Sequence, residues 1–208
     1  MKIIKYSLGQ LQANCYFLIE GEKCLIIDPA DEASFILEEI QKRKLKLVGL
    51  LATHGHFDHV MAAGEIQMSF DVPFYISRED KFLMNRFIET AEHFLGYKPS
   101  VVEPKKFSFL KEKELKISNF KLQIIQTPGH TPGSYCFYFE KDNIIFTGDT
   151  LFKQGIGRYD FSYSSKKDLK NSLKNLLKLP KETVVYSGHG EETTIGKEKK
   201  NISLRFID

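Results

Sequence analysis

One stretch decides the fold of this chain: Leu47-Val48-Gly49-Leu50-Leu51-Ala52-Thr53-His54-Gly55-His56-Phe57-Asp58-His59. Its first six residues are apolar or small and predict a buried strand. The last seven carry one carboxylate and three of the six histidines of the chain, and small and apolar residues at 60–64 then predict the start of a helix. The turn would therefore lie at the carboxyl end of a strand, where α/β sheets place ligand sites. We interpret it as half of a metal site.

Length and composition favour a single domain over residues 1–208. A hydrophobic content of 42% is enough to build a core without disulfides. The chain carries 30 Lys and Arg against 27 Asp and Glu, and a net charge of +3 is too small and scattered to indicate a nucleic-acid partner. Cys15, Cys24 and Cys136 lack CxxC spacing and indicate buried thiols in a reducing compartment. We find neither a signal peptide nor an apolar run near the ~20 residues that span a bilayer, so we expect a cytoplasmic protein with no membrane partner.

The hydrophobic pattern predicts strands and helices in two similar runs. Strands are expected at 3–8, 14–20, 23–27, 47–52, 73–76, 114–117, 121–126, 134–139, 143–147 and 183–187. Helices are expected at 32–44, 62–70, 78–91 and 168–179. The pattern is poor over 92–106, which we interpret as a lid or a mobile connection, with His93 as a surface or lid residue. Strands followed by helices, twice over, predict an α+β fold in which two sheets pack face to face with helices outside, in four layers.

Three further segments repeat the form of the first, a strand that runs into a turn with a metal-capable side chain. These turns contain His130, Asp149 and His189, each flanked by glycine or proline. A lone His or Asp in a turn is usually structural. Combined with the cluster at 54–59, however, the three matching turns favour one site at one edge of a layered sheet.

The motifs that carry these residues resemble those of one family. THGHFDH (53–59), TPGHTPGS (127–134), FTGDT (146–150) and SGHG (187–190) resemble the metallo-β-lactamase-fold hydrolase superfamily. GDTLF (148–152), GIGR (155–158) and GHGEETTIG (188–196) resemble the small single-domain members of its glyoxalase II-like, or hydroxyacylglutathione hydrolase-like, branch. The resemblance covers nearly the whole chain. It implies a four-layer αββα sandwich with a dinuclear metal site along one sheet edge.

The resemblance also implies a set of metal ligands. One metal would be held by His54, His56 and His130, the second by Asp58, His59 and His189, and Asp149 would bridge them. Imidazole and carboxylate donors suit two divalent ions, with zinc favoured and iron or manganese also compatible. Such sets leave positions open for water, which is typical of a catalytic site.

The activity implied by the resemblance is hydrolysis of a thioester. A hydroxide between the two metals would attack the acyl carbon, because coordination lowers the pKa of water from about 15.7 toward 7. Asp58 is the predicted catalytic residue, since beyond holding a metal it can steer the proton of the attacking water. The expected partner is a small-molecule thioester or ester, with glutathione-linked substrates among the candidates.

Two residues are predicted to bind substrate, Arg158 and Tyr159. Arg158 stands where two-domain glyoxalase II enzymes place a lysine for the glutathione carboxylate, and a loop-anchoring arginine is the alternative interpretation. Small members of the branch commonly carry Thr at the position of Tyr159, which implies a different pocket wall. The chain also lacks the family's glutathione-contacting aromatic after His189, and we expect no carboxy-terminal glutathione-binding domain, so S-lactoylglutathione is expected to be a poor substrate.

Other functions remain as alternatives. The first is a mononuclear-iron persulfide dioxygenase, because the motifs of this chain also resemble those of such enzymes. A non-catalytic metal-binding or redox scaffold is a second alternative, although such proteins often lose a ligand or append a flavin domain. A nuclease is disfavoured because no long basic insert is visible, and a β-lactamase is disfavoured by the missing export signal and by Asp58.

Overall fold

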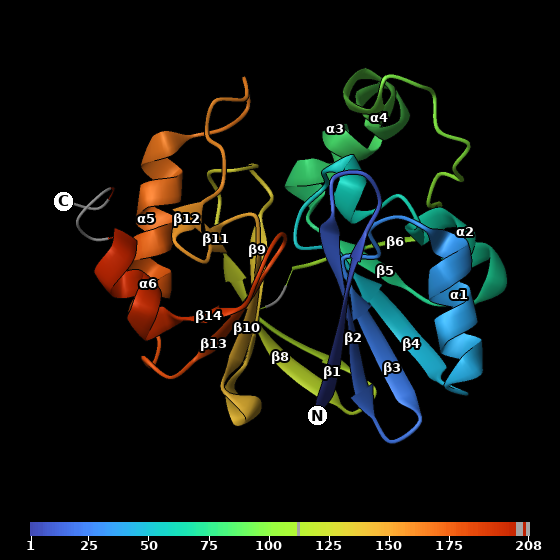
Figure 1. The fold of residues 1–208 in the computed structure, drawn as a ribbon, viewed down its shortest axis with the longest axis horizontal. Coiled ribbons are helices and arrows are strands. Elements are labelled where there is room, and N and C mark those ends of the chain that lie inside the picture. Colours follow the sequence, from blue (N-terminus) through green and yellow to red (C-terminus); the bar gives the residue numbers. More distant parts are fainter. Residues whose placement is uncertain (112, 203–205, 207–208) are drawn as a thin grey trace.

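Two six-stranded sheets stack face to face in the computed structural model, which describes residues 1–111, 113–202 and 206 (Figure 1). The first sheet has the order β1-β2-β3-β4-β5-β6. Its strands are β1 (Lys2–Leu8), β2 (Ala13–Glu20), β3 (Lys23–Ile27), β4 (Lys46–Leu51), β5 (Phe74–Ile76) and β6 (Phe107–Phe109). Strands β1 to β3 pair antiparallel, whereas β3 to β6 pair in parallel.

The second sheet has the order β14-β13-β10-β9-β8-β7. Its strands are β7 (Glu114–Ile117), β8 (Phe120–Gln126), β9 (Tyr135–Phe139), β10 (Ile144–Gly148), β13 (Val184–Ser187) and β14 (Thr193–Thr194). The strands β11 (Leu151–Phe152) and β12 (Gly155–Ile156) form a separate small hairpin. Since β8, β10 and β13 run in the same direction, their carboxyl ends meet at one edge of this sheet.

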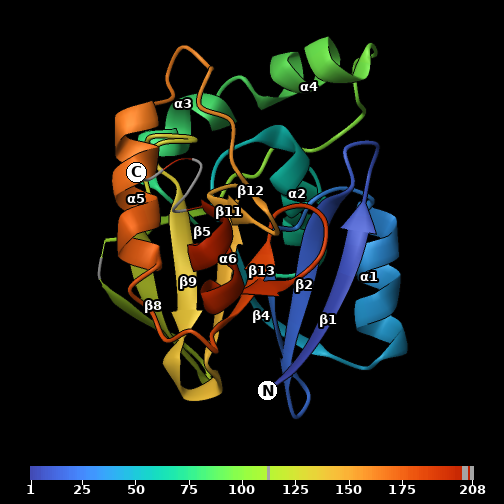
Figure 2. The same ribbon diagram turned by 60° about the vertical axis from the view of Figure 1, so that its left-hand side comes forward.

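Helices cover the outer face of each sheet (Figures 1 and 2). The first sheet is covered by α1 (Ala33–Lys42) and α2 (Ala63–Ser69), and the second by α5 (Lys166–Leu176) and α6 (Ile195–Ile202). The short helices α3 (Lys81–Met84) and α4 (Phe87–Leu95) lie beyond the sheet edges, at the top of Figure 1. The described residues also form single 3₁₀ turns at η1 (Phe57–His59), η2 (Arg78–Asp80) and η3 (Glu140–Asp142).

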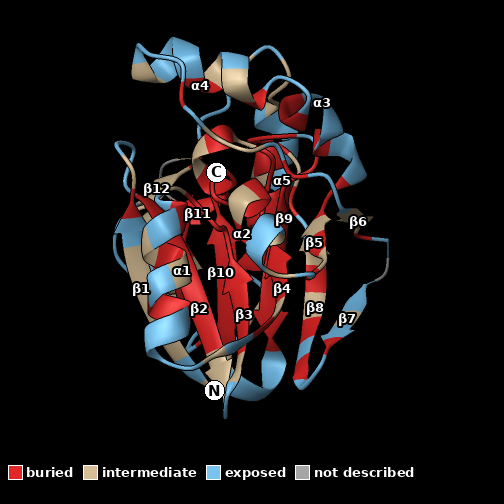
Figure 3. Cartoon of the chain, turned by 90° about the vertical axis from the view of Figure 1, so that its right-hand side faces the viewer, coloured by how far each residue is buried: buried red, intermediate tan, exposed pale blue. Residues whose placement is uncertain are grey.

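Strand β2 shows how alternating residues build the layers. Tyr16 and Leu18 point into the core between the sheets, whereas Cys15 and Phe17 point to the core under α1 and α2. All four side chains are buried, which is why this strand reads as a continuous apolar run. In Figure 3 the neighbouring central strands are likewise coloured as buried along most of their length.

The structure confirms the predicted four-layer α+β sandwich and nearly all of its long elements. It also contains elements that the pattern does not indicate, namely β6, β11, β12, β14 and α6. These strands have only two or three residues, too few to show a periodicity. The expected helix at 78–91 is instead η2, α3 and α4, and α4 continues to Leu95, where Gly96 ends it with φ of 78°.

The two sheets are joined by backbone hydrogen bonds at the edge where the predicted ligand turns lie. Tyr135 N–H donates to the carbonyl of Thr53 at 2.8 Å, and Asn14 N–H donates to the carbonyl of Gly188 at 2.7 Å. These bonds connect the turn after β4 to β9, and β2 to the turn after β13. The fold thus brings the predicted ligand turns of both sheets together.

Candidate metal centre

The turn at 53–59 is held by the buried carboxylate of Asp28, which follows strand β3. One carboxylate oxygen accepts from the backbone N–H of Thr53 at 2.7 Å. The other accepts from the Thr53 hydroxyl at 2.8 Å and faces His59 Nδ1 at 3.0 Å. Asp28 therefore fixes both the start and the end of the histidine motif.

A second buried carboxylate, Asp80, ties this turn to the turn that carries His130. It accepts from Gly55 N–H at 2.9 Å on the first turn. On the second turn it accepts from the Thr131 hydroxyl and from Gly133 N–H, both at 2.7 Å. Burial raises the pKa of Asp80, and these three hydrogen bonds oppose that shift.

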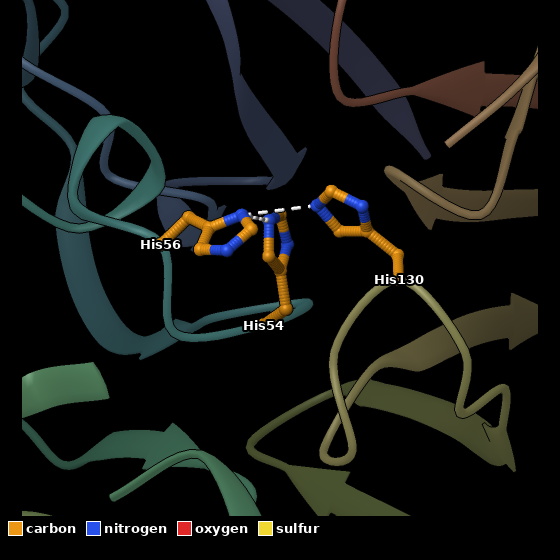
Figure 4. Close-up of side chains that lie close together, drawn as sticks. All are labelled: His54, His56 and His130. Carbon is orange, nitrogen blue, oxygen red and sulfur yellow. Dashed lines mark hydrogen bonds between the residues drawn. The ribbon is translucent and has the colours of Figure 1, made fainter. Parts of the chain in front are cut away.

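Three imidazoles converge between the two turns (Figure 4). His56 Nδ1 lies 3.1 Å from His54 Nε2 and 3.0 Å from His130 Nε2. His54 and His130 are buried and His56 is partly buried. Each residue presents one nitrogen to a common point, which is the arrangement that a metal ligand set requires.

The opposite ring nitrogens of these histidines all face hydrogen-bond acceptors. His54 Nδ1 lies 3.0 Å from the Thr53 hydroxyl oxygen, which itself donates to Asp28. His56 Nε2 lies 2.8 Å from the Tyr163 hydroxyl oxygen, and His130 Nδ1 lies 2.8 Å from the carbonyl oxygen of Arg158. Such partners place the ring proton on the outer nitrogen and leave the inner nitrogen free to bind a metal.

A second cluster of donors lies beside the first. His59 Nε2 is 3.3 Å from His189 Nε2, and a carboxylate oxygen of Asp58 is 3.4 Å from His189 Nε2 and 3.7 Å from His59 Nε2. The outer nitrogen of His59 faces Asp28, so its inner nitrogen is again the free one. Asp58, His59 and His189 could therefore hold a second ion.

Asp149 stands between the two clusters. Its Oδ1 lies 3.4 Å from His59 Nε2, and its Oδ2 lies 3.6 Å from His130 Nε2. Among the residues that the structure describes, Asp149 Oδ1 is the one buried side-chain oxygen or nitrogen without a hydrogen-bond partner. A buried carboxylate oxygen without a partner is costly, and a cation shared between the clusters would satisfy it.

Two glycines make room for this carboxylate. A Cβ at Gly188 would overlap Asp149 Oδ1, and a Cβ at Gly148 would overlap the Thr53 hydroxyl. Gly148 also has φ of 48°, in the left-handed region that favours glycine. The glycines beside the predicted ligands thus permit close approach between neighbouring turns.

The charges of the second cluster favour a cation. Burial disfavours the charged form of His59, but Asp58, Asp149 and Asp28 outweigh it and raise the pKa of His59 to about 10. Burial likewise opposes protonation of His189, yet its hydrogen bond with Asp58 raises its pKa. Burial raises the pKa of Asp58, but the histidines around Asp58 have a larger, opposite effect, so its pKa lies below the ordinary value. The carboxylates therefore favour a positive charge at this point, which a divalent ion would supply.

Two imidazoles of the first cluster, His54 and His56, are held neutral. Burial and the neighbouring histidines lower the pKa of His54 well below its ordinary value. Burial and His130 lower the pKa of His56 to about 3. Neutral imidazole is the form that binds metals, so His54 and His56 are already in that form, whereas in the second cluster a bound ion would replace the proton of His59. Imidazole and carboxylate donors of this kind fit zinc, iron or manganese.

All seven predicted ligands come together. The three donor groups that could each hold an ion are His54 with His56 and His130, His54 with His59 and Asp149, and Asp58 with His59 and His189. Within each group the ligand atoms lie within 4.8 Å of one another. Sequence reasoning missed the supporting residues Asp28, Asp80 and Tyr163. Asp28 follows an apolar strand, as several ligands do, whereas Asp80 and Tyr163 lie in no motif.

A cavity of about 380 Å³ opens onto the centre. Five predicted ligands border it: His56, Asp58, His130, Asp149 and His189. The rest of its wall is mainly apolar and includes Leu11, Phe57, Phe94, Phe152, Ile156, Phe161 and Tyr163. An apolar cavity with a few polar groups at one end is typical of a small-molecule site.

The structure places the two predicted substrate-binding residues differently. Arg158 borders the cavity, but its guanidinium forms two 2.9 Å hydrogen bonds with Asp160 and lies 4.5 Å above the Phe161 ring. Tyr159 lies outside the cavity wall and packs against Phe206, with 5.6 Å between ring centroids. His93 lies exposed on α4. Substrate binding by Arg158 and Tyr159 stays a prediction.

Comparison with known proteins identifies the family. The family model described as the Metallo-beta-lactamase superfamily matches residues 8–189 of this chain. The chain belongs to this superfamily. A superfamily protein from Haemophilus influenzae named hydroxyacylglutathione hydrolase GloC is 38% identical over 204 residues, which cover 97% of this chain and 96% of that protein. A protein from Bacillus subtilis named probable metallo-hydrolase YqgX is 36% identical over 201 residues, which cover 96% of this chain and 95% of that protein.

Two solved structures of the superfamily are similar over nearly the full chain. BLEG-1, described as a B3 metallo-beta-lactamase, is 32% identical with a TM-score of 0.91 and covers 98% of this chain and 100% of its own. TTHA1623, solved in a di-iron-bound form, is 36% identical with a TM-score of 0.88 and covers 95% of this chain and 98% of its own. In the present chain, none of the helices among the described residues is long and apolar enough to cross a membrane.

Proposed function

We propose that the protein hydrolyses thioesters with two divalent metal ions bound at the centre. The observation that carries this proposal is the pair of ligand clusters joined by Asp149, whose buried Oδ1 has no hydrogen-bond partner among the residues that the structure describes. Two relatives support it by their descriptions, the hydroxyacylglutathione hydrolase GloC and the di-iron form of TTHA1623.

The residues of the chain would divide the work. When bound, two divalent ions would supply activated water at neutral pH and polarise the substrate carbonyl. Asp58 borders the cavity and uses Oδ2 toward His59 and His189, so its second oxygen can accept a hydrogen bond from the attacking water. Its lowered pKa keeps this carboxylate ionised at neutral pH. A thiolate leaves readily, so the site needs no strong general acid.

The cavity wall favours an apolar group next to the reacting carbonyl. Phe57, Phe94 and Phe161 border the space beside the ligands. Arg158 is the cation of this wall, and its bidentate pair with Asp160 leaves little net charge for an anionic substrate. We therefore expect neutral acyl thioesters to be better substrates than S-lactoylglutathione.

A second candidate function follows from the donor set itself. His54, His59 and Asp149 form a two-histidine, one-carboxylate group, which is the set used by non-haem Fe(II) oxygenases. A mononuclear-iron persulfide dioxygenase would use such a site. It differs from the hydrolase in metal content and in its need for oxygen.

The test is a parallel assay of the purified, metal-quantified protein. The panel contains acyl-N-acetylcysteamine thioesters, S-lactoylglutathione, a lactone, a β-lactam and glutathione persulfide, the last with an oxygen electrode. We expect thioester turnover without oxygen uptake. Turnover of the β-lactam or the persulfide in preference to every thioester would contradict the proposal.

A further inference from the structure

One segment, residues 157–164, belongs both to the cavity wall and to the support of the metal ligands. Arg158, Phe161 and Tyr163 border the cavity. The same segment reaches the outer ring nitrogens of His56 and His130. These two imidazoles belong to the first cluster, so the wall and that cluster share one piece of chain.

The contact with His56 is made by a side chain. The inner nitrogen of His56, Nδ1, faces His54 and His130, and the outer nitrogen lies 2.8 Å from the Tyr163 hydroxyl oxygen. When Nδ1 binds a metal, Nε2 carries the ring proton and donates a hydrogen bond to this oxygen. The Tyr163 ring is held by stacking on Phe161, with 5.4 Å between centroids and 16° between planes.

The contacts with His130 use both a backbone carbonyl and a side-chain hydroxyl of the segment. His130 Nδ1–H donates to the carbonyl oxygen of Arg158 at 2.8 Å, and the Ser164 hydroxyl donates to the carbonyl oxygen of His130 at 2.7 Å. Gly157 packs so closely that a Cβ would overlap the carbonyl oxygen of Asp149. Residues 157–164 thus touch three of the ligands while they line the space for substrate.

We propose that residues 157–164 couple the cavity to the first metal cluster, and that Tyr163 is the positioning residue that orients His56. Tyr163 borders the cavity and contacts His56. A ligand against its ring and a metal on His56 would therefore each favour the same position of residues 157–164. Coupling of this kind is reciprocal: the cavity ligand raises metal affinity by the same factor by which the metal raises ligand affinity. The coupling rests on the proposed thioester function, whereas the positioning role of Tyr163 does not.

The variant Tyr163→Phe isolates the hydroxyl, because phenylalanine keeps the stacking on Phe161. The matched control is Tyr159→Phe in the same segment, since Tyr159 lies outside the cavity wall and, in the described part of the chain, its hydroxyl has no hydrogen-bond partner. Metal affinities are measured on the metal-free proteins with Zn²⁺ against a chromophoric chelator, and thermal unfolding confirms that each variant folds.

We expect Tyr163→Phe to weaken one of the two Zn²⁺ equivalents by about tenfold, the lower end of the range for lost outer-shell partners. Tyr159→Phe should keep both wild-type affinities. If Tyr163 only packed against its neighbours, both variants would keep the wild-type Zn²⁺ affinities. Wild-type Zn²⁺ affinity in Tyr163→Phe would therefore overturn the positioning role.

The coupling is measured with S-hexyl-N-acetylcysteamine, a neutral thioether that cannot be hydrolysed. At saturation it should raise the Zn²⁺ affinity of the wild type about fivefold, the lower end of typical coupling, and that of Tyr163→Phe by less than about twofold. A thioether that binds without changing Zn²⁺ affinity would overturn the coupling. A thioether that does not bind at all would count against both the coupling and the thioester function, and the metal affinities would still decide the role of Tyr163.

Discussion

The site has two parts that are built in opposite ways: a metal-binding floor, formed by the seven candidate ligands with Asp28 and Asp80, and the mainly apolar wall of the cavity. In the floor, buried ligands rest on buried carboxylates: Asp28 holds the turn at 53–59, and Asp80 joins it to the turn of His130. In the wall, Leu11 is 41% exposed and Phe94 47% exposed. The difference indicates that the folded core fixes the candidate ligands, whereas part of the wall is formed by exposed side chains that pack less tightly.

The largest expected effect comes from removing the carboxylate that joins the two clusters. Asp149→Ala should lose one metal ion per chain and reduce thioester hydrolysis to background, because no other carboxylate lies between the clusters in the described part of the site. Elemental analysis and the thioester assay check it. Asp142→Ala, at an exposed turn, is the control. Two bound ions and normal turnover in Asp149→Ala would show that this residue does not bridge.

The next effect tests the support under the floor. Both carboxylate oxygens of Asp80 accept a hydrogen bond from a backbone N–H, one from Gly55 and the other from Gly133. In Asp80→Asn the new NH₂ group must therefore face one of these N–H groups. We expect metal affinity to fall about 10- to 100-fold, with a loss of about 1–3 kcal/mol in unfolding free energy.

Glu198→Gln is the matched control for Asp80→Asn. Glu198 is also buried and also accepts from three donors, Gln154 N–H at 2.9 Å, the Thr193 hydroxyl at 2.6 Å and the Asn201 amide at 3.3 Å. It should lose stability but keep metal affinity. Equal loss of metal in both variants would mean that Asp80 acts only through overall stability.

The floor, but not the wall, should make the metal-free protein sensitive to alkaline pH. The pKa of His59 is raised to about 10, so the stability gained from its proton is full below the unfolded value of about 6.5 and is lost as the pH rises through 10. Chemical unfolding of the chelated protein should therefore show a falling free energy over this range. The metal-loaded protein should lack the fall, because the ion replaces the proton. A flat profile without metal would contradict the role of the surrounding carboxylates.

The smallest effect concerns the wall. Asp160→Asn frees the guanidinium of Arg158, so kcat/KM for S-lactoylglutathione should rise about two- to fivefold relative to a neutral thioester, as befits an exposed ion pair. An unchanged ratio of the two kcat/KM values would show that Asp160 does not limit binding of anions.

The same contrast explains what could be predicted from the sequence. The long strands carry clear periodicity, and the ligands sit in motifs at strand ends, so the sandwich and the turns of His54, His130 and His189 could be predicted. The hairpin β11–β12, with two residues in each strand, is set by tertiary contacts and leaves no pattern. Asp80 acts through partners 25 and 53 residues away, a relation that local spacing does not reveal.

The wall was the least predictable part of the site. Arg158 and Tyr159 are neighbours in sequence, yet only Arg158 borders the cavity, and four residues later Tyr163 meets His56. Residues 157–164 lie between β12 and α5 and form no helix or strand, so no periodicity tells which side chains face the centre.

The most direct test of the central claim is a titration of the metal-free protein with Zn²⁺ while hydrolysis of a neutral acyl thioester is followed. The two clusters joined by Asp149 predict that the rate reaches its plateau at two ions per chain. Full activity at one ion per chain, or no thioester hydrolysis with both ions bound, would contradict the account.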